Sequence, residues 1–455
     1  MMRLWPLLCL LTLCSWLNAG DPGLTAQLDQ KLSATLAASG APSVSVAVVQ
    51  NGEIVYAKAF GEANLAGKRA ADAATRYAIG SVSKQFTSAA LLLLEEQGKL
   101  SLDDKVSKFF PDLTRADEVT IRELLSHTSG YEDYAPQDYM IPAWTQPTTP
   151  RAILDQWAKK PLNFDPGTRW QYSNTNYVIA GQIFEKVSGE GLLAFLRERI
   201  FRPLGMSTPG DIAEHQAADA SAYTRYVLSP PRLVAREAPG WYFAAGELAM
   251  TPSDLARWDL AFLEKKILSA ASYEEFTREV KLKDGKETHY TLGLQLGDLN
   301  GTPMIYHGGE VSGFLTENEV FPGKGVAVAV CSNEDAINLV APLARQIAGI
   351  ALGGAPEKEL VQVRGILAGL REGRVDRALF TSDANSFFDE AVLKDYAKSL
   401  GALGKLLDLT KTNEQLRGGM THRSYSARYD KKTMRLNVYV MPDGKYEQFL
   451  VETSL

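Results

Sequence analysis

Alternation and periodicity of apolar residues predict the first elements of this chain. Leucines recur at every fourth position between residues 24 and 36, a pattern that indicates an amphipathic helix. Valines then alternate over residues 44–48, and apolar residues return over 54–60. Asn51-Gly52 lies between the two runs and is a strong turn signal, so this stretch predicts a β-hairpin.

The next apolar run, residues 85–94, begins after Gly80-Ser81 and ends before Gly98. These flanking residues are start and stop signals for a helix. We expect a buried helix of about four turns, with Ser81 in its first turn. Lys84 follows three positions later, which places the two side chains on one helix face, roughly 5–6 Å apart at Cβ.

Further apolar runs predict a helical middle followed by strands. Expected helices cover residues 119–125, 177–187, 192–200, 251–263 and 337–352, and expected strands cover 290–296, 304–306, 314–321 and 326–331. The segments 131–150 and 207–245 lack a period, and the first is a long loop able to wall a pocket. Strands at both ends pair most simply into one antiparallel sheet flanked by helices, an α+β fold with its pocket where the helical middle meets the sheet.

A second series of predicted helices and strands begins about a hundred residues before the C-terminus. Gly353-Gly354-Ala355-Pro356 reads as a linker over 353–356, which ends a first domain covering 21–352. Residues 357–455 predict two helices followed by a strand meander, a small α+β domain to which we assign a binding or packing role.

The N-terminus carries its own signal. Arg3, an apolar stretch over 4–17 and Asn18-Ala19-Gly20 are typical of a secretory signal peptide over residues 1–20. The apolar part is short for a bilayer span, so we expect a periplasmic or secreted protein with no stable membrane span after cleavage. An uncleaved membrane anchor is the alternative.

Composition narrows the function classes. The chain has 455 residues, of which 45% are hydrophobic and 22% charged, and its formal charge is −6. Without a basic cluster, nucleic acid is not an expected partner, and the oligomeric state stays open. The five histidines lack metal-ligand spacing and no dinucleotide or phosphate loop is present, so we predict neither metal nor cofactor. Two of the three cysteines lie in the predicted signal peptide, which leaves Cys331 as the one cysteine of the mature chain. It lies in a run of valines and alanines, which is typical of an unreactive thiol in a protein core.

Ser81 and Lys84 form the first candidate catalytic pair. A serine hydroxyl needs a base to become a nucleophile, and a lysine whose pKa is lowered by burial can serve as one or assist it. The helix N-terminus adds N–H groups for a developing oxyanion. The alternative is a helix cap beside a solvated charge.

Tyr172-Ser173-Asn174 is the second candidate segment and the only Tyr-x-Asn in the chain. A tyrosine near an ammonium group can ionise below its usual pKa of about 10, so we expect Tyr172 to act as general base and acid. Asn174 would hold Lys84 and the substrate amide. The alternative is a turn with a packed aromatic residue.

His307-Gly308-Gly309 is the third, in the strand region. Glycines there let a substrate backbone approach, and the N–H of Glu310 is a candidate second oxyanion donor. A glycine-rich hairpin with an exposed histidine is the alternative.

Together, Ser-x-x-Lys, Tyr-x-Asn and His-x-Gly in this order resemble the serine β-lactamases and penicillin-binding proteins. The tyrosine form is similar to the branch of class C β-lactamases, D-Ala-D-Ala carboxypeptidases, D-aminopeptidases and esterases. The segments 125–130 and 245–255 also resemble this family, and the likeness covers roughly 25–352. The last hundred residues look faintly like NTF2-type domains.

The resemblance implies an acyl-enzyme mechanism on a small-molecule or peptide substrate: an ester, a D-amino-acid peptide or a β-lactam-like amide. Ser81 would attack, Tyr172 with Lys84 would move the proton, and the N–H groups of Ser81 and Glu310 would stabilise the oxyanion. His307-Gly-Gly departs from the Lys-Thr-Gly of β-lactamases, and a histidine is mostly neutral at pH 7. We therefore favour an esterase or peptidase over an efficient β-lactamase. A non-hydrolytic sensor or binding protein with the same fold is the alternative.

Overall fold

The computed structural model describes residues 22–137, 139–352 and 358–453. The chain divides into two compact units, one up to Leu352 and one from Gly353. The predicted signal over 1–20 and linker over 353–356 lie outside the described residues and stay predictions. No helix within the described ranges has both the length and the apolarity needed to cross a bilayer.

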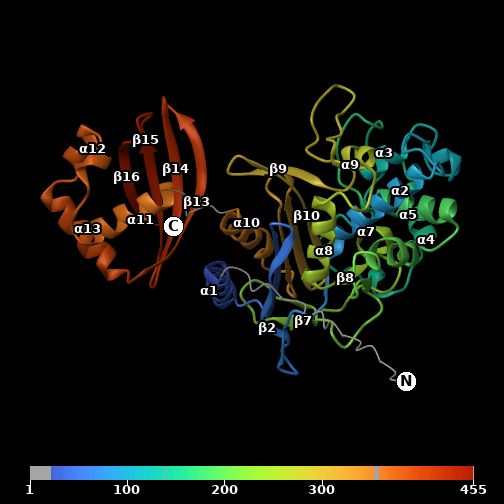
Figure 1. Cartoon of the computed structure of the whole chain (residues 1–455), viewed down its shortest axis with the longest axis horizontal. Helices are drawn as coiled ribbons and strands as arrows, with labels where there is room; N and C mark the ends of the chain where they lie inside the picture. Colours follow the sequence, from blue (N-terminus) through green and yellow to red (C-terminus); the bar gives the residue numbers. More distant parts are fainter. Residues whose placement is uncertain (1–21, 138, 353–357, 454–455) are drawn as a thin grey trace, which may run out of the picture. The chain divides into compact units, whose positions relative to one another are not determined.

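A seven-stranded antiparallel sheet forms the centre of the first unit, and it joins strands from both ends of that unit as the sequence predicted (Figure 1). Its order is β3-β2-β1-β12-β11-β10-β9. The strands are β1 (Ser43–Gln50), β2 (Glu53–Asn64), β3 (Arg69–Ala70), β9 (Gln295–Leu299), β10 (Thr302–Val311), β11 (Phe314–Phe321) and β12 (Val326–Ser332).

Helices cover both faces of this sheet, because successive residues of each strand point to opposite sides. On one face, Val328 of β12 packs with Leu28 of α1 (Pro22–Ser39) and Leu343 of α10 (Val340–Ala351). On the other, Ala329 packs in the cluster that holds Phe86 of α2 (Lys84–Glu96), and α8 (Pro252–Leu263) covers β1 and β12 there. Figure 1 shows α1 and α10 on one side of the sheet and α2 and α8 on the other.

The middle of the first unit is helical, as predicted, with irregular connections. Its helices are α3 (Ile121–Leu125), α4 (Pro150–Ile153), α5 (Asn174–Ser188), α6 (Leu192–Leu196), α7 (Phe243–Gly246) and α9 (Ala270–Thr277). Short pairings tie the connections together: β4 (Tyr77–Ala78), β8 (Leu248–Met250) and β5 (Gly210–Asp211) in one sheet, and β6 (Tyr223–Thr224) with β7 (Arg232–Leu233) in another.

Two expected elements differ from the structure. The strand predicted over 290–296 begins only at Gln295, because Gly293 adopts a left-handed φ of 92° and Thr291 bonds Leu294 in a turn. The helix predicted to hold Ser81 begins at Lys84, after a tight turn over Gly80–Ser83. Ser81 therefore stands just ahead of the α-helix rather than in its first turn.

Over residues 358–453, the second unit is a four-stranded antiparallel sheet with three α-helices. Its elements are α11 (Lys358–Arg371), α12 (Ser382–Phe387), α13 (Glu390–Ala402), β13 (Leu406–Arg417), β14 (Met420–Tyr429), β15 (Thr433–Val440) and β16 (Tyr446–Thr453). Sequence analysis missed α12, a helix of six residues, and therefore predicted two helices here instead of three. It also missed β13, an edge strand whose second half is exposed on both faces and so shows no alternation. The small α+β unit is confirmed in outline, whereas its likeness to NTF2-type domains stays a prediction.

Candidate active site

Ser81 lies on the tight turn that leads into α2, where β10 crosses closely. Gly80 has a left-handed φ of 50°, and a Cβ there would lie 2.7 Å from the backbone nitrogen of Glu310. A Cβ on Gly309 would lie 1.9 Å from the carbonyl oxygen of Ile79 and 3.3 Å from the nitrogen of Ser81. Only glycine permits this approach at both positions. The two backbone N–H groups predicted to face an oxyanion thus belong to adjoining segments.

Lys84 is fully buried, and its amine is surrounded by oxygens from three segments. Nζ donates to Ser81 Oγ at 2.9 Å, to Asn174 Oδ1 at 2.8 Å and to the carbonyl oxygen of Ala245 at 2.8 Å. Burial lowers the pKa of Lys84 to about 7, with the carboxylate of Asp133 opposing the shift. Near neutral pH the amine is therefore present in both its neutral and its charged form, which confirms the predicted buried lysine.

Tyr172 completes the triad of side chains that the sequence predicted. Its hydroxyl donates to Ser81 Oγ at 2.7 Å, and its ring packs against His127 with the ring centres 4.3 Å apart. The expectation that Tyr172 ionises easily is wrong, because burial raises the pKa of this phenol well above 10. Lys84 lies 4.8 Å from the centre of the Tyr172 ring and does not offset that desolvation. Tyr172 is thus a protonated hydrogen-bond donor.

Asn174, the first residue of α5, links the triad to an acidic residue that sequence analysis missed. Its Oδ1 accepts from Lys84, as predicted, while its backbone nitrogen and Nδ2 donate to Asp133 at 2.9 and 3.4 Å. The Asn174 amide group is thereby fixed in one orientation. Asp133 lies in the loop predicted to wall a pocket, and burial raises the pKa of its carboxyl group.

His307 is 2% exposed, so the alternative of an exposed histidine on a hairpin is wrong. Its Nδ1 donates to the carbonyl oxygen of Gly308 at 2.6 Å, and its Nε2 accepts from the hydroxyl of Tyr290 at 2.9 Å. Burial lowers the pKa of His307 to about 3, and the nearby charge of Lys84 adds to the effect. The ring is therefore neutral, as expected, and both its nitrogens bond within the protein rather than pointing a cation at a substrate.

Except for the enclosed Lys84, the site residues predicted from the sequence line one cavity of about 650 Å³ at the junction of the sheet and the helical region. Ser81, Tyr172, Asn174 and Gly309 all contribute to its wall. The described residues that line it include no lysine or arginine side chain but five acidic ones: Asp133, Glu237, Glu310, Glu317 and Asp335. The lining is therefore rich in acidic groups, although the Lys84 amine lies 2.9 Å from Ser81 Oγ.

Comparison with known proteins agrees with this geometry. A family model described as Beta-lactamase matches residues 28–352. This chain belongs to the Beta-lactamase family. The resemblance found in the sequence is thereby confirmed for the first unit.

Named relatives of this β-lactamase-family protein include penicillin-binding proteins and aminopeptidases. Penicillin-binding protein 4* of Bacillus subtilis is 30% identical over 291 residues, which cover 60% of this chain and 64% of the relative. A D-aminopeptidase of Brucella melitensis is 30% identical over 284 residues, covering 60% of this chain and 52% of the relative. The matches thus span between about half and two thirds of these relatives' own length.

Solved structures share the fold. A D-stereospecific amidohydrolase from Streptomyces has a TM-score of 0.60 at 27% identity and covers 68% of this chain and 94% of its own. The octameric penicillin-binding protein homologue from Pyrococcus abyssi has a TM-score of 0.64 and covers 94% of this chain and 99% of its own. Its identity is 23%, so it supports the fold alone.

Several residues around the triad were given no role from the sequence, although two of them lie in segments noted for their resemblance to the family. His127 is fully buried, accepts from the Ser173 nitrogen at 3.2 Å and packs against the ring of Tyr172, so it positions that ring. Ala245 accepts a hydrogen bond from Lys84 through its backbone oxygen, and a backbone contact cannot be predicted from the type of side chain. The Gly308 carbonyl oxygen fixes the tautomer of His307, and Tyr290 donates to the remaining nitrogen, Nε2, from a segment that the sequence predicted only as part of a strand.

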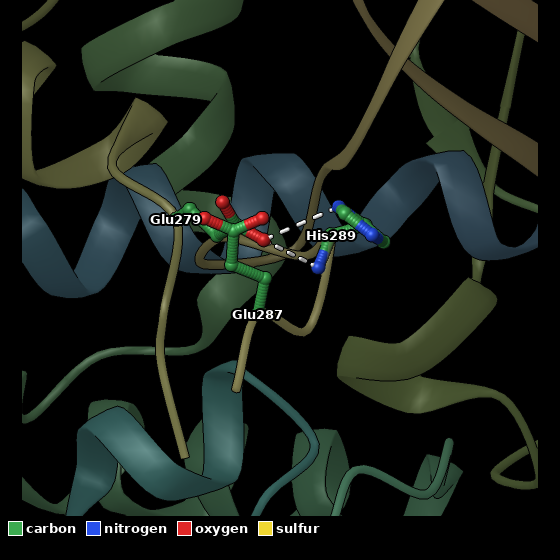
Figure 2. Close-up of side chains that lie close together, drawn as sticks. All are labelled: Glu279, Glu287 and His289. Atoms are coloured by element: carbon green, nitrogen blue, oxygen red, sulfur yellow. Dashed lines mark hydrogen bonds and ion pairs between the residues drawn. The ribbon is translucent and has the colours of Figure 1, made fainter. Parts of the chain in front are cut away.

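Outside the cavity, Glu279, Glu287 and His289 form a group whose ligand atoms lie within 4.8 Å of one another (Figure 2). Glu279 Oε1 accepts from the His289 backbone nitrogen at 2.7 Å and lies 3.3 Å from Nδ1. Glu287 pairs with Lys281 at 3.4 Å. Each of the three side chains thus has a partner within the protein, and the absence of a metal stays a prediction.

The close crossing of β10 over the turn at Ser81 gives a direct test. Gly309→Ala places a methyl group against the Ile79 carbonyl, so we expect a loss of about 1–3 kcal/mol in the free energy of unfolding and displacement of Ser81. Urea unfolding followed by tryptophan fluorescence measures the change in unfolding free energy of the first unit, because every described tryptophan lies there. Gly349→Ala in α10, which meets no atom within 4 Å, is the matched control and should be neutral or stabilising. Equal stability of both variants would contradict the role of this crossing.

Proposed function

We propose that this protein is a serine hydrolase that forms an acyl-enzyme on Ser81. The observation that supports this most strongly is the position of Ser81 Oγ, 2.9 Å from Lys84 Nζ and 2.7 Å from the Tyr172 hydroxyl. A nucleophile within hydrogen-bonding reach of a base that titrates near neutral pH is the arrangement that covalent catalysis requires.

In the proposed mechanism Lys84, rather than Tyr172, is the base. The neutral amine takes the Ser81 proton as Oγ attacks the substrate carbonyl, and the N–H groups of Ser81 and Glu310 stabilise the oxyanion. Tyr172, protonated in the resting enzyme, gives its proton to the leaving group as the tetrahedral intermediate collapses and takes the Ser81 proton over from Lys84. Water then attacks the acyl-enzyme and gives its proton to the neutral Lys84 amine, which passes it to Ser81 Oγ as the acid is released.

The substrate that we propose is an ester or a D-amino-acid amide or peptide in preference to a β-lactam. D-Aminopeptidases and a D-stereospecific amidohydrolase are among the similar proteins. An anionic β-lactam would enter a cavity lined by five acidic residues, and His307 is neutral and bonded on both nitrogens. The alternative, a non-hydrolytic sensor with this fold, predicts slow acylation of Ser81 or none.

Single substitutions in the triad separate these functions. Ser81→Ala should abolish both turnover and labelling by a fluorescent phosphonate while the protein stays folded. Tyr172→Phe should slow acylation by about 10²–10⁴-fold, because it removes a proton donor from the reacting serine. The exposed Tyr226→Phe is its control and should react normally. Absence of labelling in a folded wild-type protein would favour the sensor, and near-normal rates in Tyr172→Phe would exclude Tyr172 as the donor.

The pH dependence tests the identity of the base. The folded-state pKa of Lys84 is about 7, so the amine is charged and inactive as a base below that pH and neutral above it. The rate of Ser81 labelling should rise about tenfold per pH unit below pH 7 and level off above about pH 8. Lys84→Arg, which keeps the charge, should remain slow throughout. A flat wild-type profile over the same range would eliminate Lys84 as the base.

We also propose that the protein is exported to the periplasm or beyond the cell, on the basis of its first twenty residues. Mass spectrometry of the intact protein recovered from the producing cells should then find a mature N-terminus close to Asp21. Retention of Met1 or Met2 on the cell-associated protein would instead indicate an uncleaved anchor or no export.

A further inference from the structure

Glu317 of β11 reaches the catalytic cavity from the far face of β10. It pairs in register with Gly308, and a Cβ on Gly308 would lie 3.1 Å from Glu317 Oε2. The glycine thus leaves room for the carboxyl group against the backbone of β10. Both Glu317 and Gly308 line the same cavity as Ser81.

The carboxyl group of Glu317 has no hydrogen-bond donor in the part of the chain that the structure describes, although the residue is only 5% exposed. Other acidic residues of the cavity are bonded: Asp133 accepts from Asn174, Glu237 from Ser312 and Asp335 from the Gly313 nitrogen. A buried carboxylate without a partner is unfavourable, so a donor from a ligand would stabilise it strongly.

The charged groups that face Glu317 do not supply that donor. From the same strand comes Glu319, which is fully buried and whose pKa is raised to about 8 by burial and by the charge of Glu317, so it is mainly neutral at pH 7. From β10 comes Tyr306, whose pKa burial also raises, so it is uncharged. From α10 comes Arg345, whose Nε lies 3.6 Å from Glu319 and which is half exposed. Burial raises the pKa of Glu317 to about 7, with the charge of Arg345 opposing the shift.

We propose that Glu317 is a cation-binding subsite of the catalytic cavity, which selects substrates that carry an ammonium or guanidinium group on a long arm. This inference rests on the proposed hydrolysis at Ser81 for its substrate but not for its geometry. The cavity offers the cation an acidic wall and no competing lysine or arginine among the described lining residues.

The geometry of β10 indicates how long the cation-bearing arm of the substrate has to be. Successive residues of β10 face opposite sides, so Gly309 faces Ser81 while Gly308 faces Glu317. The segment 307–311 extends past the pairing of β10 with β9, which covers Thr302–Tyr306. A substrate arm can therefore pass the unpaired edge of β10 there. The cation lies several bonds from the reacting carbonyl, as in a lysine or arginine side chain, rather than at an α-amino group.

Matched substrates test the subsite. The probes are D-lysyl and D-norleucyl p-nitroanilides, and D-alanyl dipeptides that end in lysine or norleucine, so that the cation lies on the acyl or on the leaving arm. In whichever pair places the cation on the arm that reaches Glu317, kcat/KM at about pH 8 should be about tenfold or more higher for the lysine substrate than for the norleucine substrate. Glu317→Gln should reduce that ratio to near one, whereas the exposed Glu190→Gln should leave it unchanged. Equal rates within both pairs, or a ratio that survives Glu317→Gln, would overturn the proposal.

The pH dependence of the ratio gives a second readout. Glu317 is negatively charged above its pKa of about 7 and neutral below it, so the preference for the cation should fall as the pH is lowered through 7. The titration of Lys84 cancels in the ratio, because both members of a pair use the same base. A ratio that is constant across this range would contradict the role of Glu317.

Binding separates this inference from the proposed reaction. Calorimetry with Ser81→Ala protein and the intact D-lysyl and D-norleucyl probes should show tighter binding of a cationic member, abolished by adding Glu317→Gln. If the preference is present but wild-type protein turns over neither probe, the proposed hydrolysis fails and the subsite stands. If turnover depends on Ser81 but binding shows no preference for charge, the subsite fails and the hydrolase stands.

Discussion

The burial of one lysine amine is the constraint on which the site depends. Lys84 Nζ bonds to oxygens of Ser81, Asn174 and Ala245, which belong to three parts of the chain. An amine removed from water needs such partners, yet they do not restore the stability that bulk water gives its charge. The same enclosure therefore fixes the position of the serine and lowers the pKa of the lysine to the range where it acts as a base.

The same desolvation acts on the other groups of the cavity, with a sign that depends on their charge. It lowers the pKa of the bases Lys84 and His307 and raises the pKa of the acids Tyr172 and Glu317. The uncharged forms of His307 and Tyr172 thus dominate at neutral pH, and the lysine is the group left to accept a proton. The acidic side chains that line the cavity in turn support the proposed preference for positively charged ligands.

Much of the fold and the site could be predicted from local pattern. Apolar runs bounded by turn residues identified β1, β11 and β12 to within a few residues, because these strands are buried along almost their whole length. The half-buried β2 was identified too, but it extends to Asn64, beyond its predicted end. The exposed strand β13 and the turn at Gly293 were not predicted, because neither segment shows a periodic pattern of apolar residues. The three side chains predicted to be catalytic from short motifs, Ser81, Lys84 and Tyr172, meet in the structure.

The sequence by itself determined the residue types, the order of the elements and the proximity of Ser81 to Lys84, because these depend on neighbours along the chain. Only the tertiary structure decided the protonation of Tyr172 and His307, the bond between Asn174 and Asp133, and the exposure of Glu317 to the cavity. Those properties depend on how much water and which charges distant segments leave around each group. The spacing of residues along the chain does not specify that environment.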